Sequence, residues 1–84
     1  MKIIRINFDQ FNSLKEFHLW LKEQCNFPEY YGCNLDALYD CLTDDPHFEF
    51  EVVDSRCFEY YQTKLINNIM DTGCRVKRVF DHEL

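Results

Sequence analysis

The sequence predicts an α/β fold in which three parallel strands form a sheet and three helices pack on it. Residues 4–8 and 48–53 alternate apolar and polar side chains, as half-buried strands do. Residues 13–24 and 58–70 repeat apolar side chains at helical spacing. The order strand, helix, helix, strand, helix, strand places helices between successive strands, which indicates parallel pairing with right-handed connections.

Length and composition predict a single domain over residues 1–84 with a modest core. Eight Phe, five Tyr and one Trp supply large rings that bury about 150–250 Å² each. The first residues lack the long apolar segment of a signal peptide, and no run approaches the roughly 18 apolar residues of a membrane span. We therefore expect a cytoplasmic protein.

The five cysteines are expected to be reduced structural thiols. Their number is odd, and no C-x-x-C pair or common zinc spacing occurs among Cys25, Cys33, Cys41, Cys57 and Cys74. Cys33 differs because it lies in a predicted loop, where it could oxidise. We expect neither a metal nor another cofactor.

The first strand is predicted from Ile4, Ile6 and Phe8, which alternate with polar residues. Ile3 would face the opposite side, which is expected if helices cover part of both faces of the sheet.

The first helix is predicted over residues 13–24, because Ser13 and Glu16 fit a capping box. Its apolar stripe would run through Leu14, Phe17, Leu21 and Cys25. His18 lies beside this stripe, and with no second ligand nearby we expect a packed or rim histidine rather than a metal ligand.

Residues 28–43 form the central stretch of the chain, a loop followed by a short helix. Gly32 permits backbone angles that other residues resist, and Asn34 is a good N-cap. A stripe of leucines (Leu35, Leu38, Leu42) would be buried. A second face would carry Asp36, Asp40 and Thr43, with Tyr39 between the two faces.

The remaining elements are assigned from turn and capping signals. Residues 43–46 would end the second helix, and Asp54 and Ser55 would cap the third. The apolar stripe of the third helix would include Phe58, Tyr61, Leu65, Ile66, Ile69 and Met70. Gly73 would stop it, residues 74–80 would form the last strand, and residues 81–84 would fray.

The charge is distributed unevenly. The net charge is −6, yet no lysine or arginine occurs between Lys22 and Arg56, where nine acidic residues lie. Such a field attracts a basic partner and is screened by salt. It argues against nucleic-acid binding, which needs a positive surface.

The central stretch also carries a resemblance. The run Pro-Glu-Tyr-Tyr-Gly-x-Asn-Leu-Asp-Ala-Leu-x-Asp-Cys-Leu, from Pro28 onward, resembles the signature of the barstar family, small intracellular inhibitors of ribonucleases. The resemblance implies a barstar-like fold with a three-stranded parallel sheet. It also implies that the chain is a monomer when free and forms a one-to-one complex with a basic ribonuclease. If that ribonuclease is a toxin, the chain would be its immunity protein.

The resemblance assigns roles to residues of this stretch. Asp40 would insert deepest into the basic active site of the ribonuclease, with Asp36 beside it. Tyr30 would stack on the edge of that site, Gly32, Asn34 and Leu35 would offer contacts along the loop, and Tyr39 and Thr43 would border the surface. Carboxylates suit this role because they accept charge-assisted hydrogen bonds from arginine.

Three departures from the family pattern leave the identity of the ribonuclease open. Cys33 stands where an acid is usual, and Tyr39 stands where tryptophan is common. Asn67 and Asn68 occupy the region where the last helix of the familiar inhibitor contributes an acid.

Two other functions are weighed against inhibition. An enzyme could use Asp36 and Asp40 as an acid/base pair, but an exposed one-turn pair does not separate the two pKa values as such catalysis requires. His18, His47 and His82 have no recognisable nucleophile partner, and the chain has only two glycines. The other function is a non-inhibitory module that binds a basic protein through the same acidic face.

Overall fold

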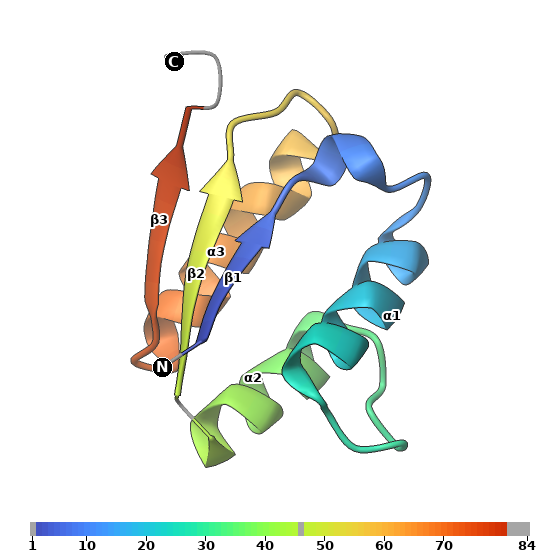
Figure 1. Ribbon diagram of the computed structural model, residues 1–84, viewed down its shortest axis with the longest axis vertical. Helices are drawn as coiled ribbons and strands as arrows, with labels where there is room; N and C mark the ends of the chain where they lie inside the picture. The colour runs from blue at the N-terminus through green and yellow to red at the C-terminus, as the bar shows by residue number, and fades with distance from the viewer. Residues whose placement is uncertain (1, 46, 81–84) are drawn as a thin grey trace.

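The computed structural model describes residues 2–45 and 47–80. Its elements follow the order β1 (Lys2–Ile6), η1 (Phe8–Gln10), α1 (Leu14–Cys25), α2 (Leu35–Asp44), β2 (Phe48–Val53), α3 (Glu59–Asp71) and β3 (Arg75–Val79) (Figure 1). Apart from the short 3-10 helix η1, this is the predicted order of strands and helices. The predicted frayed end, Pro46 of the predicted turn, and His82 lie outside the described residues.

The sheet is parallel throughout, as predicted, with β2 in the centre. Ile4 lies opposite Phe50 in the pairing of β1 with β2, and Phe50 lies opposite Val76 in the pairing of β2 with β3. The residues of β2 are buried at every second position and half-buried between, until Val52 and Val53 are both buried. This burial pattern is expected for the middle strand.

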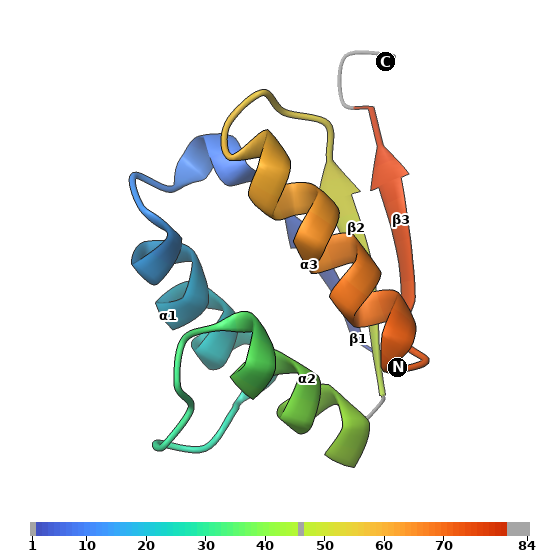
Figure 2. The same ribbon diagram turned by 180° about the vertical axis from the view of Figure 1, so that it is seen from behind.

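The core lies between the sheet and the three helices. Figure 2 shows α3 across the sheet, with α1 and α2 beside it on the side of β1. Two strands and the three α-helices contribute large buried side chains, whereas β3 has none; they are Ile4, Ile6, Phe17, Leu21, Leu38, Leu42, Phe50, Val52, Leu65 and Ile69.

The expectation that helices cover part of both faces of the sheet is wrong. In Figure 1 the near face of the sheet carries no helix among the described residues. Ile3 on that face is 56% exposed, and its neighbour Arg5 is exposed too. Instead of a second layer of helices, an ion-pair ladder crosses this face, with Glu51 between Arg5 at 3.4 Å and Lys77 at 3.5 Å.

The predicted first strand also ends earlier than expected. β1 stops at Ile6, and the side chain of Asn7 accepts a hydrogen bond from the amide of Asp9 at 3.0 Å. This bond begins η1, which turns Phe8 into the core with no exposed surface. Alternation of apolar residues cannot separate a strand from such a turn, because Phe8 is buried in both.

α1 matches its prediction closely. The hydroxyl of Ser13 accepts a hydrogen bond from the amide of Glu16 at 3.1 Å, which is half of a capping box. The predicted stripe is confirmed at Phe17, Leu21 and Cys25, which are buried. The helix ends because Asn26 adopts a left-handed conformation, with φ of 55°.

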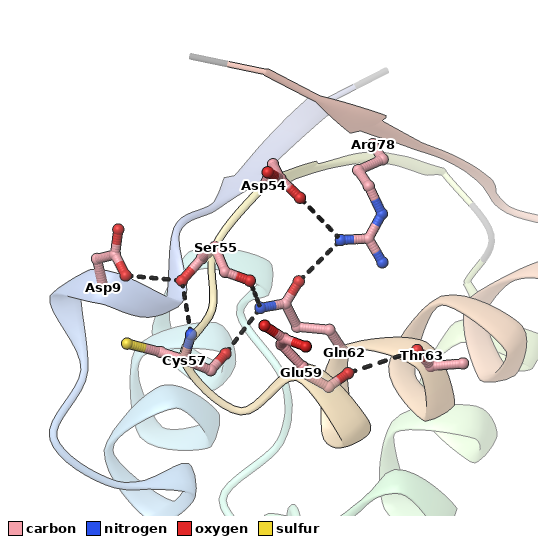
Figure 3. Close-up of polar contacts among 8 residues, drawn as sticks. All are labelled: Asp9, Asp54, Ser55, Cys57, Glu59, Gln62, Thr63 and Arg78. Atoms are coloured by element: carbon pink, nitrogen blue, oxygen red, sulfur yellow. Dashed lines mark hydrogen bonds and ion pairs between the residues drawn. The ribbon is translucent and has the colours of Figure 1, made fainter. Parts of the chain in front are cut away.

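The prediction that Asp54 and Ser55 cap the third helix is wrong. α3 begins four residues later, after Phe58, whose φ of 55° is left-handed. Figure 3 shows why: Ser55 serves a turn instead, because its hydroxyl donates to Asp9 at 2.6 Å and accepts from the amide of Cys57 at 3.0 Å.

Gln62 on α3 tethers the turn that precedes the helix. Its amide nitrogen donates to the carbonyl oxygens of Ser55 at 3.1 Å and Cys57 at 2.7 Å, and its oxygen accepts from Arg78 at 3.0 Å (Figure 3). Arg78 also pairs with Asp54 at 3.7 Å. The side-chain nitrogen and oxygen of the buried Gln62 are therefore both hydrogen-bonded, and we assign this cluster a structural role.

Replacing Gln62 with leucine is expected to lower the free energy of unfolding by about 2–4 kcal/mol. Gln62 is fully buried, and the change removes its hydrogen bonds to two carbonyl groups and to Arg78; each such bond contributes about 0.5–1.5 kcal/mol net, and one to a charged group about 1.5–3 kcal/mol. Urea denaturation measures the loss. The matched control is Thr63→Ala next to it, an exposed change expected to stay within about 0.5 kcal/mol. Equal stabilities of the two variants would contradict the role of Gln62.

The end of α3 follows its prediction in part. Leu65 and Ile69 are buried as predicted, Tyr61 and Ile66 are half-buried, and Met70 is 60% exposed, so its inclusion in the stripe is wrong. Met70 lies at the margin of the helix face, where periodicity does not decide burial. Gly73 stops the helix as predicted, with φ of 89°.

Candidate functional site

The short helix α2 is built as its sequence predicts. The side-chain oxygen of Asn34 accepts a hydrogen bond from the amide of Ala37 at 2.8 Å, which confirms Asn34 as the N-cap. Leu38 and Leu42 are fully buried, and Leu35 is half-buried. Docking of this leucine face leaves Asp36, Tyr39, Asp40 and Thr43 exposed on the surface of the helix.

Removing the cap is expected to destabilise the protein measurably. Asn34→Ala should lower the free energy of unfolding by about 1 kcal/mol, whereas Asn34→Gly should cost only a few tenths. Chemical denaturation of the two variants tests this difference. An unchanged free energy of unfolding in Asn34→Ala would show that the side-chain hydrogen bond to Ala37 contributes nothing.

The loop before α2 differs from its prediction in one backbone detail. The left-handed residue is Cys33, with φ of 55°, and not Gly32. A Cβ atom placed on Gly32 would lie 3.4 Å from the side-chain nitrogen of Asn34 and 3.5 Å from Cβ of Ala37. Gly32 therefore leaves room beside the cap, which is a different role from the one predicted.

Neighbouring tyrosines of this loop point in opposite directions. Tyr30 is 86% exposed, whereas Tyr31 is buried. The Tyr31 ring packs on Phe27, with centroids 4.9 Å apart, and its hydroxyl bonds to Nδ1 of His18 at 2.7 Å. Anchoring Tyr31 thus presents Tyr30 to solvent.

His18 is a packed histidine, not a rim one. It is 1% exposed, and its Nε2 bonds to the hydroxyl of Tyr61 on α3. Burial lowers the pKa of His18 to about 4 and raises the pKa of Tyr61 to about 12. The side chains of His18 and Tyr61 are therefore both neutral at pH 7. Sequence reasoning missed this network, because no spacing pattern links residues 18, 31 and 61.

The acidic block is only partly neutralised by the chain's own cations. Glu51 pairs with Arg5 and Lys77, Asp54 with Arg78, and Glu29 with Lys22 at 3.5 Å, while Asp45 contacts the imidazole of His47. Asp36, Asp40 and Asp44 form no ion pair within residues 2–45 and 47–80. These three carboxylates recur at intervals of one helical turn on α2.

This arrangement is unfavourable for α2 itself. Like charges one turn apart repel by about 0.2–0.5 kcal/mol per pair. Asp44 also stands in the last turn, where the helix dipole disfavours negative charge and no basic residue compensates. Sequence reasoning left out Asp44, although its spacing of four residues from Asp40 was a usable signal.

Two hollows flank α2 and divide the predicted site residues between them. Tyr30 and Asp40 line a cavity of about 220 Å³, together with Phe27, Cys41 and Asp44. Asn34, Leu35 and Asp36 line the other, of about 410 Å³, together with His18, Tyr60 and Tyr61. Gly32, Tyr39 and Thr43 line neither of these two hollows. The hydroxyl of Thr43 instead donates to the carbonyl oxygen of Tyr39 within α2.

The cysteines of the site region are free thiols, as are the others. Cys74 is buried, whereas Cys41 is half-buried. Burial, with the charges of Asp40 and Asp44, raises the pKa of the Cys41 thiol. Among the described residues, no group of three His, Cys, Asp or Glu side chains is placed to hold a metal ion.

None of the described helices combines the length and apolar character that a membrane-spanning segment needs.

Comparison with known proteins bears on the same region. A Bacillus subtilis (strain 168) protein named "Putative ribonuclease inhibitor YrdF" is 49% identical to this chain over 43 residues, which are 51% of this chain and 47% of that protein. The alignment therefore spans about half the length of the relative. The family model described as Barstar (barnase inhibitor) matches residues 1–77. These residues contain α2, its acidic face and all but the last part of the sheet, and the chain therefore belongs to the barstar family.

Proposed function

We propose that this chain is a ribonuclease inhibitor that covers the basic active site of its ribonuclease with α2 and the loop before it. The observation that carries the proposal is the set of three exposed carboxylates on α2, Asp36, Asp40 and Asp44, which form no ion pair with a cation of residues 2–45 and 47–80. A helix that bears repelling charges at a cost to its own stability is understandable if a partner supplies the missing cations.

The chemistry of ribonucleases supplies such cations. An active site that binds an RNA phosphate and stabilises an anionic transition state is lined by arginine, lysine and histidine. Carboxylates that enter this site can replace the phosphate, since they accept strong and often bidentate hydrogen bonds from arginine. Membership in a family described as barnase inhibitors and likeness to a protein named as a ribonuclease inhibitor support the same function.

The site residues take the following roles in this proposal. Asp40 enters the basic site deepest, with Asp36 beside it. Tyr30, exposed beside Asp40 at one hollow, stacks on the edge of the active site. Gly32, Asn34 and Leu35 contact the partner along the loop, and Tyr39 and Thr43 border the surface.

The chain would act as a single domain, a monomer when free, in a one-to-one complex in the cytoplasm, and would not itself be an enzyme. An immunity role follows if the ribonuclease is a toxin. A complex with a basic protein that leaves RNA cleavage intact would instead support a non-inhibitory binding module.

The test is a titration of ribonuclease activity. Barnase and a panel of other basic ribonucleases are mixed with increasing amounts of the chain, and cleavage of a fluorescent RNA is followed. We expect activity of at least one enzyme to fall to zero at one equivalent, and the affinity to weaken as salt rises, because exposed charges steer the encounter. Undiminished cleavage by every enzyme of the panel, at micromolar concentrations of the chain, would contradict the proposal.

A further inference from the structure

The loop that carries Tyr30 has one buried side chain, Tyr31, while Phe27 and Cys33 pack partly buried against the core. Tyr31 lies in the core between Phe27 and His18, with its ring centroid 4.9 Å from the first and 5.8 Å from the second. Its hydroxyl reaches Nδ1 of His18 on α1 at 2.7 Å. Glu29 of the loop also pairs with Lys22 of α1 at 3.5 Å. This pair is exposed, and exposed ion pairs contribute little to stability.

Both nitrogens of the His18 imidazole are hydrogen-bonded. A neutral imidazole has one donor and one acceptor, so one of its tyrosine partners accepts a hydrogen bond and the other donates one. Nδ1 serves Tyr31 of the loop, and Nε2 serves Tyr61 of α3. His18 thus joins the loop to α1, which directly precedes it, and to α3, which is distant from it in the sequence.

The consequences extend to the residues on both sides of Tyr31. Tyr30 can point to solvent because the next residue is held inside. Gly32 and Cys33 then lead directly to Asn34, whose side chain donates to the carbonyl oxygen of Gly32 at 3.3 Å and accepts from Ala37 at the start of α2. The position of Tyr31 therefore determines where the loop meets α2.

We propose that His18 is a positioning residue for the partner-binding surface, which it holds in one conformation by its hydrogen bond to Tyr31. A surface that is ordered before the partner arrives loses less conformational entropy on binding, which favours affinity. The effect on the free loop is independent of any partner, and only the effect on affinity rests on the proposed ribonuclease function.

The two tyrosines offer a matched pair of variants. Tyr31→Phe and Tyr61→Phe each delete one hydroxyl group, and each leaves one nitrogen of the same imidazole unpaired. Both should lower the denaturation midpoint by similar amounts. Only Tyr31→Phe frees the loop, so the difference between the variants separates positioning from stability.

Amide hydrogen exchange of the free protein, monitored by NMR, measures directly how often the loop opens. The amide of residue 31 bonds to the carbonyl oxygen of Pro28 at 3.0 Å, and the amide of Ala37 bonds to Asn34. We expect both to exchange about tenfold faster in Tyr31→Phe than in the wild type, and to change little in Tyr61→Phe. Equal acceleration in the two variants would overturn the proposal.

Substitution of the histidine gives a second readout that tolerates a loss of stability. Glutamine can both donate and accept hydrogen bonds, whereas leucine can do neither. Exchange at residue 31 should therefore be slower in His18→Gln than in His18→Leu when both are compared at the same distance from their denaturation midpoints. Identical exchange in both would show that packing alone holds the loop.

The last measurement is the affinity for the partner. With a ribonuclease that the wild type inhibits, Tyr31→Phe should weaken the affinity by about three- to tenfold more than Tyr61→Phe does. If the wild type inhibits no ribonuclease while the exchange difference is present, the proposed function fails and the positioning role stands. If inhibition is present and the two variants match in exchange and affinity, the positioning role fails.

Discussion

Replacing Asp40 with asparagine is expected to weaken ribonuclease binding by about a hundredfold to several thousandfold, with no loss of stability. The shape of the side chain is kept, so the change removes the charge alone. Leaving a buried charge without its partner costs about 3–5 kcal/mol, and each 1.4 kcal/mol is about tenfold in affinity. In the proposed complex the uncompensated charge is an arginine or lysine of the ribonuclease.

The stability of the free chain should move in the opposite direction. Asp40 is exposed and makes no ion pair among the described residues, so nothing within the fold depends on its charge. Its removal relieves repulsion from Asp36 and Asp44, worth about 0.2–0.5 kcal/mol for each pair. Isothermal titration with the ribonuclease and urea denaturation of the free variant measure the two effects.

Asp71→Asn is the matched control for this experiment. Asp71 is also exposed and carries the same charge, but it ends α3 instead of lying on α2. Only the long-range field changes there, so the affinity should fall by no more than about threefold in physiological salt. Similar losses in both variants would mean that net charge drives binding and that Asp40 has no special place.

Acidification from pH 7 to pH 4 is expected to remove up to about 3 kcal/mol of stability through His18 alone. Burial lowers the pKa of His18 from 6.5 to about 4. Between these two values His18 is protonated in the unfolded chain and neutral in the folded chain. The contribution is fully present above pH 6.5 and is lost progressively as the pH falls to about 4, at about 1.4 kcal/mol per pH unit.

This loss is large for a chain of 84 residues, whose total stability is expected to be about 4–13 kcal/mol. Urea denaturation of the wild type and of His18→Gln between pH 4 and pH 8 measures it. The difference between the two slopes isolates His18, because the carboxylates are common to both proteins. Parallel curves over this range would contradict a neutral, buried His18.

The elements predicted correctly are those that local chemistry specifies. Ser13 and Asn34 cap helices that begin right after them, and Gly73 ends α3 in the backbone conformation that glycine favours. The apolar spacing of β2 and α1 was read correctly because each buries one face against a single core. The exposed position of Asp36 and Asp40 follows from the same periodicity.

The errors arose where distant residues compete for a local signal. Ser55 resembles an N-cap, yet its hydroxyl bonds to Asp9 and to the turn at Cys57, and Gln62 of α3 donates to the carbonyl oxygens of the same turn. Gln62 is polar and fully buried, which no hydrophobic pattern predicts. Ile3 is apolar and exposed, because charged side chains of three strands cross its face of the sheet.

By itself the sequence determined the α/β class, the order of elements and an acidic helix without basic residues near it in the chain, since these depend on periodicity, caps and composition. Only the tertiary structure decided which acids keep their charge unopposed. The cations that neutralise Glu51 and Asp54 belong to β1 and β3. Among the described residues, no cation forms an ion pair with an acid of α2. Ion pairing and the bond of His18 to Tyr31 depend on distances in space, which spacing along a chain does not contain.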